Sequence, residues 1–115
     1  MGQTPGTMVL IRSEQMGRGD DALGAKLLGT FLRTLTTLEA KPDTIVFYNG
    51  AARLLGPGSG SLDALRALEE EGVELLACIT CLEFFGLTEK IEVGTVTNMR
   101  EIAQRMLAAG KVITL

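Results

Sequence analysis

The chain has 115 residues, of which 46% are hydrophobic, and 11 basic against 14 acidic side chains give it a formal net charge of −3. A chain of this length forms one domain. Its acidic balance argues against nucleic acid or an anionic membrane as a partner, because both attract a basic face. So large an apolar fraction is difficult to bury in a small monomer, and we therefore expect a homo-oligomer.

The first seven residues lack the basic start and apolar core of a secretory signal, and no apolar stretch approaches the roughly 20 residues of a membrane-spanning helix. Two cysteines three residues apart do not make a disulfide framework. We therefore expect a cytoplasmic protein. Residues 1–7 are predicted to be a disordered tail or the remnant of a linker, and residues 8–115 to be a single domain.

Short apolar runs typical of strands buried on both faces recur along the chain. They lie at residues 8–12, 44–48 and 73–77, and further strands are predicted at 111–115 and, in shorter form, at 91–93. Segments with apolar residues at helical spacing alternate with these runs. Helices are predicted to follow the N-caps Asp20 or Asp21, Ser61, and Thr97 or Asn98, and a short apolar helix is predicted at 82–86.

This alternation predicts an α/β fold, namely a three-layer sandwich with a mostly parallel sheet of about five strands and helices on both faces. In such sheets, ligands and chemistry lie at the carboxyl ends of the strands. The loops at 13–20, 49–60 and 78–86 all follow predicted strands. They are therefore the expected walls of a functional site.

The sequence Cys78-Ile79-Thr80-Cys81 contains the only two cysteines, and the chain has no histidine. It stands between a predicted strand and a predicted helix, where unpaired backbone N–H groups and the helix dipole favour a thiolate. The thiolate is the reactive form of cysteine. Cys78 and Cys81 are therefore the candidate catalytic residues.

Other interpretations of the cysteines remain open. Cys78 alone could be a small buried hydrophobic residue. A zinc site needs four ligands, so this chain would have to share one between subunits. A thioredoxin-like exchanger also has Cys-x-x-Cys at a helix start, but its motif follows an early strand and faces a cis-proline. A flavin-binding domain is disfavoured, because the chain has no tryptophan and only one tyrosine, Tyr48, to stack on the flavin ring. We expect no metal and no cofactor.

Polar residues in the neighbouring loops are candidates for substrate binding. Arg18 lies in the glycine-containing loop Met16-Gly-Arg-Gly-Asp-Asp21 and could stabilise a thiolate or an anionic sulfur donor. Asn49 and Gly50 form a turn signal after a strand and could supply a polar wall, and Thr80 lies between the cysteines. The simpler explanation of both loops is structural, since glycines supply turn freedom and the aspartates begin a helix.

Several segments together resemble one known family. They are residues 16–24, 42–50, 72–78, 80–82 and 93–99. In order, they resemble the DsrE/DsrF-like sulfur-relay family, and most closely the C-terminal domain found in YedF-like, sulfurtransferase-like selenium metabolism proteins. Relatives usually have glycine where this chain has Ile79, and often where it has Ala51. Because a β-branched residue does not readily adopt positive φ, Ile79 predicts a different loop geometry.

The resemblance implies a domain that assembles into dimers, trimers or hexamers. Family members accept sulfane sulfur as a cysteine persulfide and pass it on. Cys78 matches the persulfide-carrying position and Cys81 the second cysteine of the YedF-like group. The implied function is a sulfur or selenium carrier, a possible sulfurtransferase, working between TusA-like or desulfurase-like donor and acceptor proteins. The alternatives are a non-catalytic binding or assembly subunit of a sulfur-relay complex, and thiol–disulfide exchange.

Overall fold

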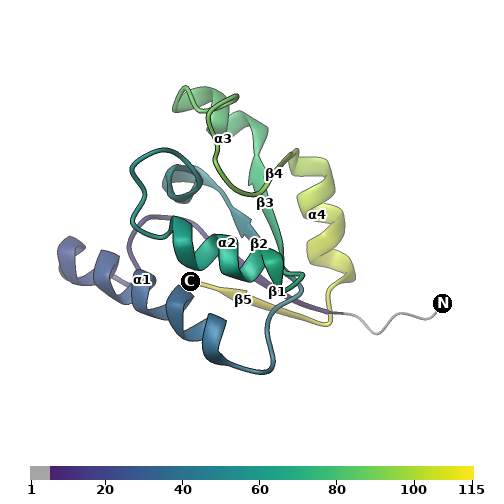
Figure 1. Ribbon diagram of the computed structural model, residues 1–115. Helices are drawn as coiled ribbons and strands as arrows, with labels where there is room; N and C mark the ends of the chain where they lie inside the picture. Colours follow the sequence, from purple (N-terminus) through teal and green to yellow (C-terminus); the bar gives the residue numbers. More distant parts are fainter. Residues whose placement is uncertain (1–5) are drawn as a thin grey trace.

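The computed structural model describes residues 6–115, in which five parallel strands form one sheet between two helical layers (Figure 1). The strands are β1 (Thr7–Ile11), β2 (Thr44–Phe47), β3 (Glu74–Cys78), β4 (Thr95–Thr97) and β5 (Lys111–Thr114). Their order across the sheet is β4-β3-β2-β1-β5, and all four neighbouring pairs are parallel. The predicted α/β sandwich is confirmed, with a sheet that is parallel throughout.

The helices cover the two faces of the sheet unequally. They are α1 (Asp21–Thr37), the 3-10 helix η1 (Asn49–Leu55), α2 (Leu62–Glu70), α3 (Ile79–Phe84) and α4 (Met99–Ala108). Figure 1 shows α1 and α2 on one side of the sheet and α4 on the other, with α3 beyond the carboxyl end of β3. No helix within residues 6–115 combines the length and the apolar character needed to cross a membrane.

Alternate strand residues point into two separate apolar clusters, as the period of a strand requires. Val9, Ile45 and Leu75 pack against the leucines of α1 and α2 in the larger cluster. On the other face, the smaller cluster consists of six buried residues: Met8, Leu10, Val46, Leu76, Cys78 and Ile102. Ile102 is the only buried residue of α4, so a single side chain carries the apolar contact of this helix with the sheet.

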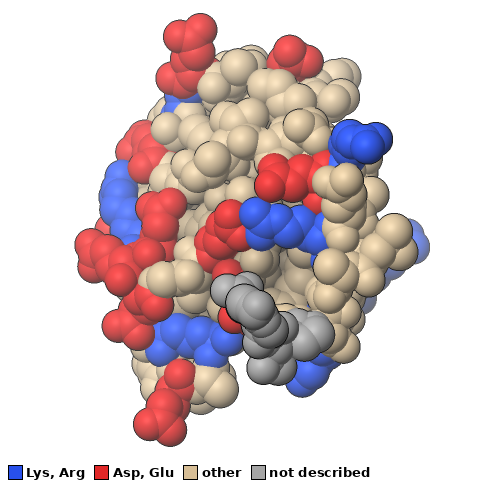
Figure 2. All heavy atoms as spheres, turned by 90° about the vertical axis from the view of Figure 1, so that its right-hand side faces the viewer, with Lys and Arg blue, Asp and Glu red and all other residues tan. Residues whose placement is uncertain are grey.

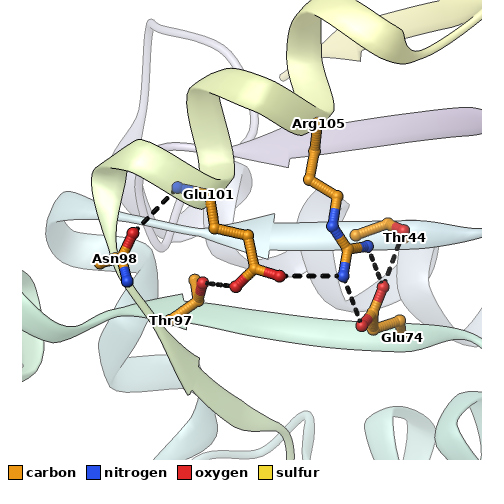
Figure 3. Close-up of polar contacts among 6 residues, drawn as sticks. All are labelled: Thr44, Glu74, Thr97, Asn98, Glu101 and Arg105. Carbon is orange, nitrogen blue, oxygen red and sulfur yellow. Dashed lines mark hydrogen bonds and ion pairs between the residues drawn. The ribbon is translucent and has the colours of Figure 1, made fainter.

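A polar cluster adds a second attachment of α4 (Figure 3). The Arg105 guanidinium forms a two-point ion pair with Glu74 at the start of β3 and donates to Glu101 Oε2 at 3.2 Å. Glu101 also accepts a hydrogen bond from the Thr97 hydroxyl. Figure 2 shows acidic and basic side chains side by side on the face that it presents, together with wide uncharged areas.

Two of the three predicted N-caps form the expected hydrogen bond. Asp20 accepts from the backbone N–H of Leu23 at 2.9 Å, and Asn98 accepts from that of Glu101 at 2.9 Å. Ser61 occupies the N-cap position of α2, but its hydroxyl makes no capping hydrogen bond. Ser61 therefore occupies the predicted N-cap position, but the capping hydrogen bond expected of it is absent.

Two other predicted elements differ from the structure. Residues 91–93 are not a strand; the fourth strand is Thr95–Thr97. Val93 is buried in the larger cluster, and Gly94 then turns the chain with φ +88° so that β4 can pair with β3. The short helix predicted at 82–86 begins instead at Ile79, so Ile79 takes a helical conformation and needs no positive φ. Residues 1–5 of the predicted tail lie outside the described residues, and Thr7 is the first residue of β1.

Candidate functional site

Cys78 is the last residue of β3 and lies inside the protein. Its side chain is 2% exposed and belongs to the smaller cluster, beneath α4. It is also the residue immediately before α3. The pattern of alternating strand residues therefore directs the Cys78 thiol to the thinly covered face of the sheet.

Cys81 lies in the first turn of α3 and is partly exposed. It packs against both apolar clusters, so it sits at the carboxyl edge of the sheet where the two faces meet. Both cysteines are free thiols. Of the two, Cys81 is the one that solvent reaches.

The sulfur of Cys81 has a defined hydrogen-bond donor. The backbone N–H of Asn49 donates to Cys81 Sγ at 3.0 Å. Asn49 has φ +52°, and it is the only residue other than glycine with positive φ in residues 6–115. Asparagine tolerates this left-handed conformation better than most residues. The turn after β2 thus places a backbone donor on a sulfur 32 residues further along the chain.

The surroundings of Cys81 disfavour its thiolate on balance. Burial raises the pKa of the Cys81 thiol, and the adjacent Cys78 thiol raises it further through charge repulsion and a thiol–thiol hydrogen bond. The Asn49 N–H acts in the opposite direction and offsets part of this effect. The expectation of a lowered pKa is therefore wrong for Cys81, because burial of the thiol has the largest effect and raises its pKa.

Comparisons with known proteins agree with this fold. The family model described as the DsrE/DsrF-like family matches residues 22–115. The chain belongs to the DsrE/DsrF-like family. No curated protein sequence matched the chain.

Three solved structures share the DsrE/DsrF-like fold with this chain. The ychN protein from E. coli is 19% identical with a TM-score of 0.64. The match covers 95% of this chain and 98% of the ychN chain. MTH1491 from Methanobacterium thermoautotrophicum, a protein of unknown function, is 22% identical with a TM-score of 0.69. The match covers 95% of this chain and 97% of MTH1491. BT1422 from Bacteroides thetaiotaomicron, a conserved protein of unknown function, is 12% identical with a TM-score of 0.62. The match covers 95% of this chain and 94% of BT1422. At these identities the likeness shows the fold alone.

The structure brings only some of the candidate substrate-binding residues of this DsrE/DsrF-like domain together. Asn49 contacts Cys81, Gly50 follows it in η1, and Thr80 is exposed in the first turn of α3. Arg18 lies apart from them. It lines a pocket of about 270 Å³ with Arg12, Ser13, Gln15, Gly17 and Leu115, and neither cysteine is among these lining residues.

The loop that carries Arg18 is fixed by Gly24 of α1. The backbone N–H of Met16 donates to the Gly24 carbonyl at 2.9 Å. A Cβ at Gly24 would lie 2.7 Å from the Cβ of Gln15, closer than a Cβ atom approaches another side chain in proteins. Gly24, the last residue of the first segment that resembles the family, therefore has a packing role.

Arg53 of η1 is a further residue near the cysteine-bearing helix α3. Its guanidinium lies 4.5 Å over the Phe85 ring, directly after α3, and pairs with Glu14 at 2.8 Å. An exposed arginine in a 3-10 helix carries no sequence pattern that points to these contacts. Within the described residues, no group of three or more histidine, cysteine or carboxylate side chains is placed to hold a metal ion.

Proposed function

We propose that this DsrE/DsrF-like domain is a sulfur carrier that accepts a sulfane sulfur on its cysteine pair and relays it to another protein. The observation that carries the proposal is the meeting of two free thiols at the carboxyl edge of the sheet, with the Asn49 N–H on one of them. Membership of the DsrE/DsrF-like family, which is associated with sulfur relay, supports it. The finer relation to YedF-like proteins, and selenium as an alternative cargo, are part of the proposal.

In the proposed loading step, the Cys78 thiolate attacks the outer sulfur of a donor persulfide. The S–S bond of the donor breaks, the donor leaves as a thiolate, and Cys78 becomes a persulfide with no net change in oxidation. Because Cys78 is 2% exposed, the donor must enter beside Cys81 as the short α3 opens locally. The raised pKa of Cys81 keeps it protonated at neutral pH, so Cys81 does not compete for the donor sulfur.

Unloading has two routes that balance. An acceptor thiolate can attack the outer sulfur, which regenerates the Cys78 thiol. Alternatively, the Cys81 thiol gives its proton to the anionic outer sulfur of the persulfide and attacks the inner sulfur, and the outer sulfur leaves as hydrosulfide. This second route oxidises the pair to a Cys78–Cys81 disulfide, which a cellular dithiol then reduces.

The proposed partners are TusA-like or desulfurase-like proteins, together with further copies of this chain. Exposed apolar side chains of α4 and β5 support self-association: Met99, Met106, Leu107 and Val112. They belong to elements at the α4 side of the sheet, where Figure 2 shows wide uncharged areas. A dimer, trimer or hexamer would bury this surface.

A second candidate is a non-catalytic binding or assembly subunit of a sulfur-relay complex. The observations in its favour are the burial of Cys78 and the raised pKa of Cys81, since both slow thiol chemistry. Thiol–disulfide exchange through the same pair is a third candidate, favoured by the contact between the two thiols.

Intact-protein mass spectrometry separates these candidates. The protein is incubated with a cysteine desulfurase and cysteine, alongside Cys78→Ser, Cys81→Ser and the double variant. A carrier gains the mass of one sulfur atom, loses it on treatment with dithiothreitol, and fails to gain it in Cys78→Ser. Loss of the gain only in Cys81→Ser would assign the persulfide to Cys81. No gain in any variant, with slow alkylation of both thiols, would favour the assembly subunit.

A further inference from the structure

A second pocket lies on the opposite helical layer from α4, between α1, η1 and the loop that precedes α2. Its volume is about 580 Å³, within the range of small-molecule sites. One wall is the α1 face that includes Lys26, Gly29 and Arg33, and the other is the loop 57–61. The pocket lies outside the cysteine site, because neither cysteine lines it.

Basic side chains dominate the charge of this pocket. Lys26 and Arg33 are seven residues apart on one face of α1, and Arg53 comes from η1. Glu14 is the one acidic residue in the lining, and it pairs with Arg53 at 2.8 Å. Three positive charges against one negative charge give the pocket a net charge of +2, in a chain whose formal net charge is −3. An anion is therefore the favoured occupant.

Gly29 shapes the wall beneath Arg33. A Cβ at Gly29 would lie 3.1 Å from Arg33 Nη1, so the guanidinium occupies the space that a side chain would fill. Arg33 Nη2 also donates to the Thr30 hydroxyl at 3.3 Å. Glycine is unfavourable inside a helix, and here its absence of a side chain lets Arg33 lie close to the pocket wall.

The start of α2 forms the opposite wall and leaves a hydroxyl group unused. Ser61 is 9% exposed and lines the pocket, and no hydrogen bond of its hydroxyl is found within residues 6–115. A serine at this position normally caps the first N–H groups of the helix. Without that cap, the Ser61 hydroxyl remains for a ligand in the pocket.

We propose that this pocket binds the phosphate group of a small phosphorylated molecule. A phosphate dianion matches the excess of positive charge in the lining, and its oxygens accept hydrogen bonds from the Lys26 and Arg33 side chains and from the Ser61 hydroxyl. The volume leaves room for a sugar-sized remainder beside the phosphate. The site is independent of the proposed sulfur chemistry.

Isothermal titration calorimetry with inorganic phosphate and with ribose 5-phosphate tests the proposal, with ribose as the uncharged control. Both phosphates are expected to bind at millimolar or tighter dissociation constants and ribose not to bind. Ribose 5-phosphate binding tighter than phosphate would show use of the whole pocket, and equal binding would assign the site to the phosphate group itself. Absence of heat and of NMR shift changes with both phosphates at 10 mM would overturn the proposal.

Three substitutions make the test specific. Arg33→Gln is expected to weaken phosphate binding about tenfold, whereas Arg66→Gln, an exposed arginine of α2 outside the pocket, is expected to leave it unchanged. Ser61→Ala should weaken binding several-fold without lowering the melting temperature, since the hydroxyl does not cap the helix. Equal weakening by Arg33→Gln and Arg66→Gln would refute a defined site and indicate diffuse attraction to positive charge.

Discussion

Replacing Ile102 with alanine should loosen α4 from the sheet and uncover Cys78. Ile102 is 1% exposed and is the one buried residue of its helix. Buried Ile→Ala changes cost about 2–5 kcal/mol. The smaller cluster is a thin layer that can partly collapse around the lost atoms, so we expect roughly 2–3 kcal/mol here. With an m-value of about 1–3 kcal/mol per molar urea, the unfolding midpoint should fall by roughly 1–2 M.

Leu107→Ala is the matched control, because it removes an aliphatic side chain of similar size from the same helix at a position that is 90% exposed. It should change the free energy of unfolding by less than about 0.5 kcal/mol. Urea titrations at two protein concentrations separate this effect from any loss of self-association. The rate at which Ellman's reagent modifies Cys78, measured in the Cys81→Ser background, should rise in Ile102→Ala only. A similar cost for both variants, or no change in the modification rate, would refute the view that Ile102 carries the apolar contact that holds α4 over Cys78.

The remaining predictions concern charge and close packing. Because the pKa of Cys81 is raised, the rate of its alkylation by iodoacetamide should reach half of its maximum at a higher pH than for an ordinary thiol. Cys78→Ser should lower this midpoint, because Cys78 contributes to the raised pKa. A midpoint that Cys78→Ser leaves unchanged would exclude an influence of Cys78 on the Cys81 pKa. Gly24→Ala should lower the free energy of unfolding, measured by thermal unfolding, by about 1–2 kcal/mol, because the close contact with Gln15 outweighs the gain in helix propensity. Gly60→Ala places its methyl group in open space and should change the free energy of unfolding by less than about 0.5 kcal/mol. Arg105→Ala should cost roughly 1 kcal/mol, and the cost should shrink in 1 M salt; a cost independent of salt would show that packing and not charge is lost.

The fold could be predicted from the sequence because its signals are local. The apolar runs of β1, β2 and β3 are typical of buried parallel strands, and the leucines of α1 keep helical spacing. The exception is instructive. Ile91 and Val93 do pack into or against the larger cluster, as their apolar character predicts, but hydrogen-bonded pairing begins only after the turn at Gly94. The pattern of apolar residues therefore predicts which segments are buried, but it does not predict which buried segment pairs with a strand of the sheet.

The candidate site was predictable in its residues and not in its contacts. The position of Cys78 and Cys81 after a strand was visible, since two cysteines with this spacing stand out in a chain without others. The hydrogen bond from Asn49 to Cys81 depends on a left-handed backbone conformation and on two neighbouring parallel strands. The burial that separates Cys78 from Cys81 depends on the face to which each thiol points. Both are properties of the assembled sheet, which no local pattern encodes.

The strand order has a consequence for the synthesis of the protein on the ribosome. β1 is the first strand to be made, but its second neighbour, β5, consists of residues 111–114 at the far end of the chain. Until these residues leave the ribosome, the backbone donors and acceptors along one side of β1 have no strand to pair with, although β2, β3 and β4 can already be in place. An exposed strand edge of this kind can pair with other chains. Nascent chains should therefore depend on chaperones until residues 111–114 are available to pair with β1, and removal of residues 111–115 should yield a protein that aggregates.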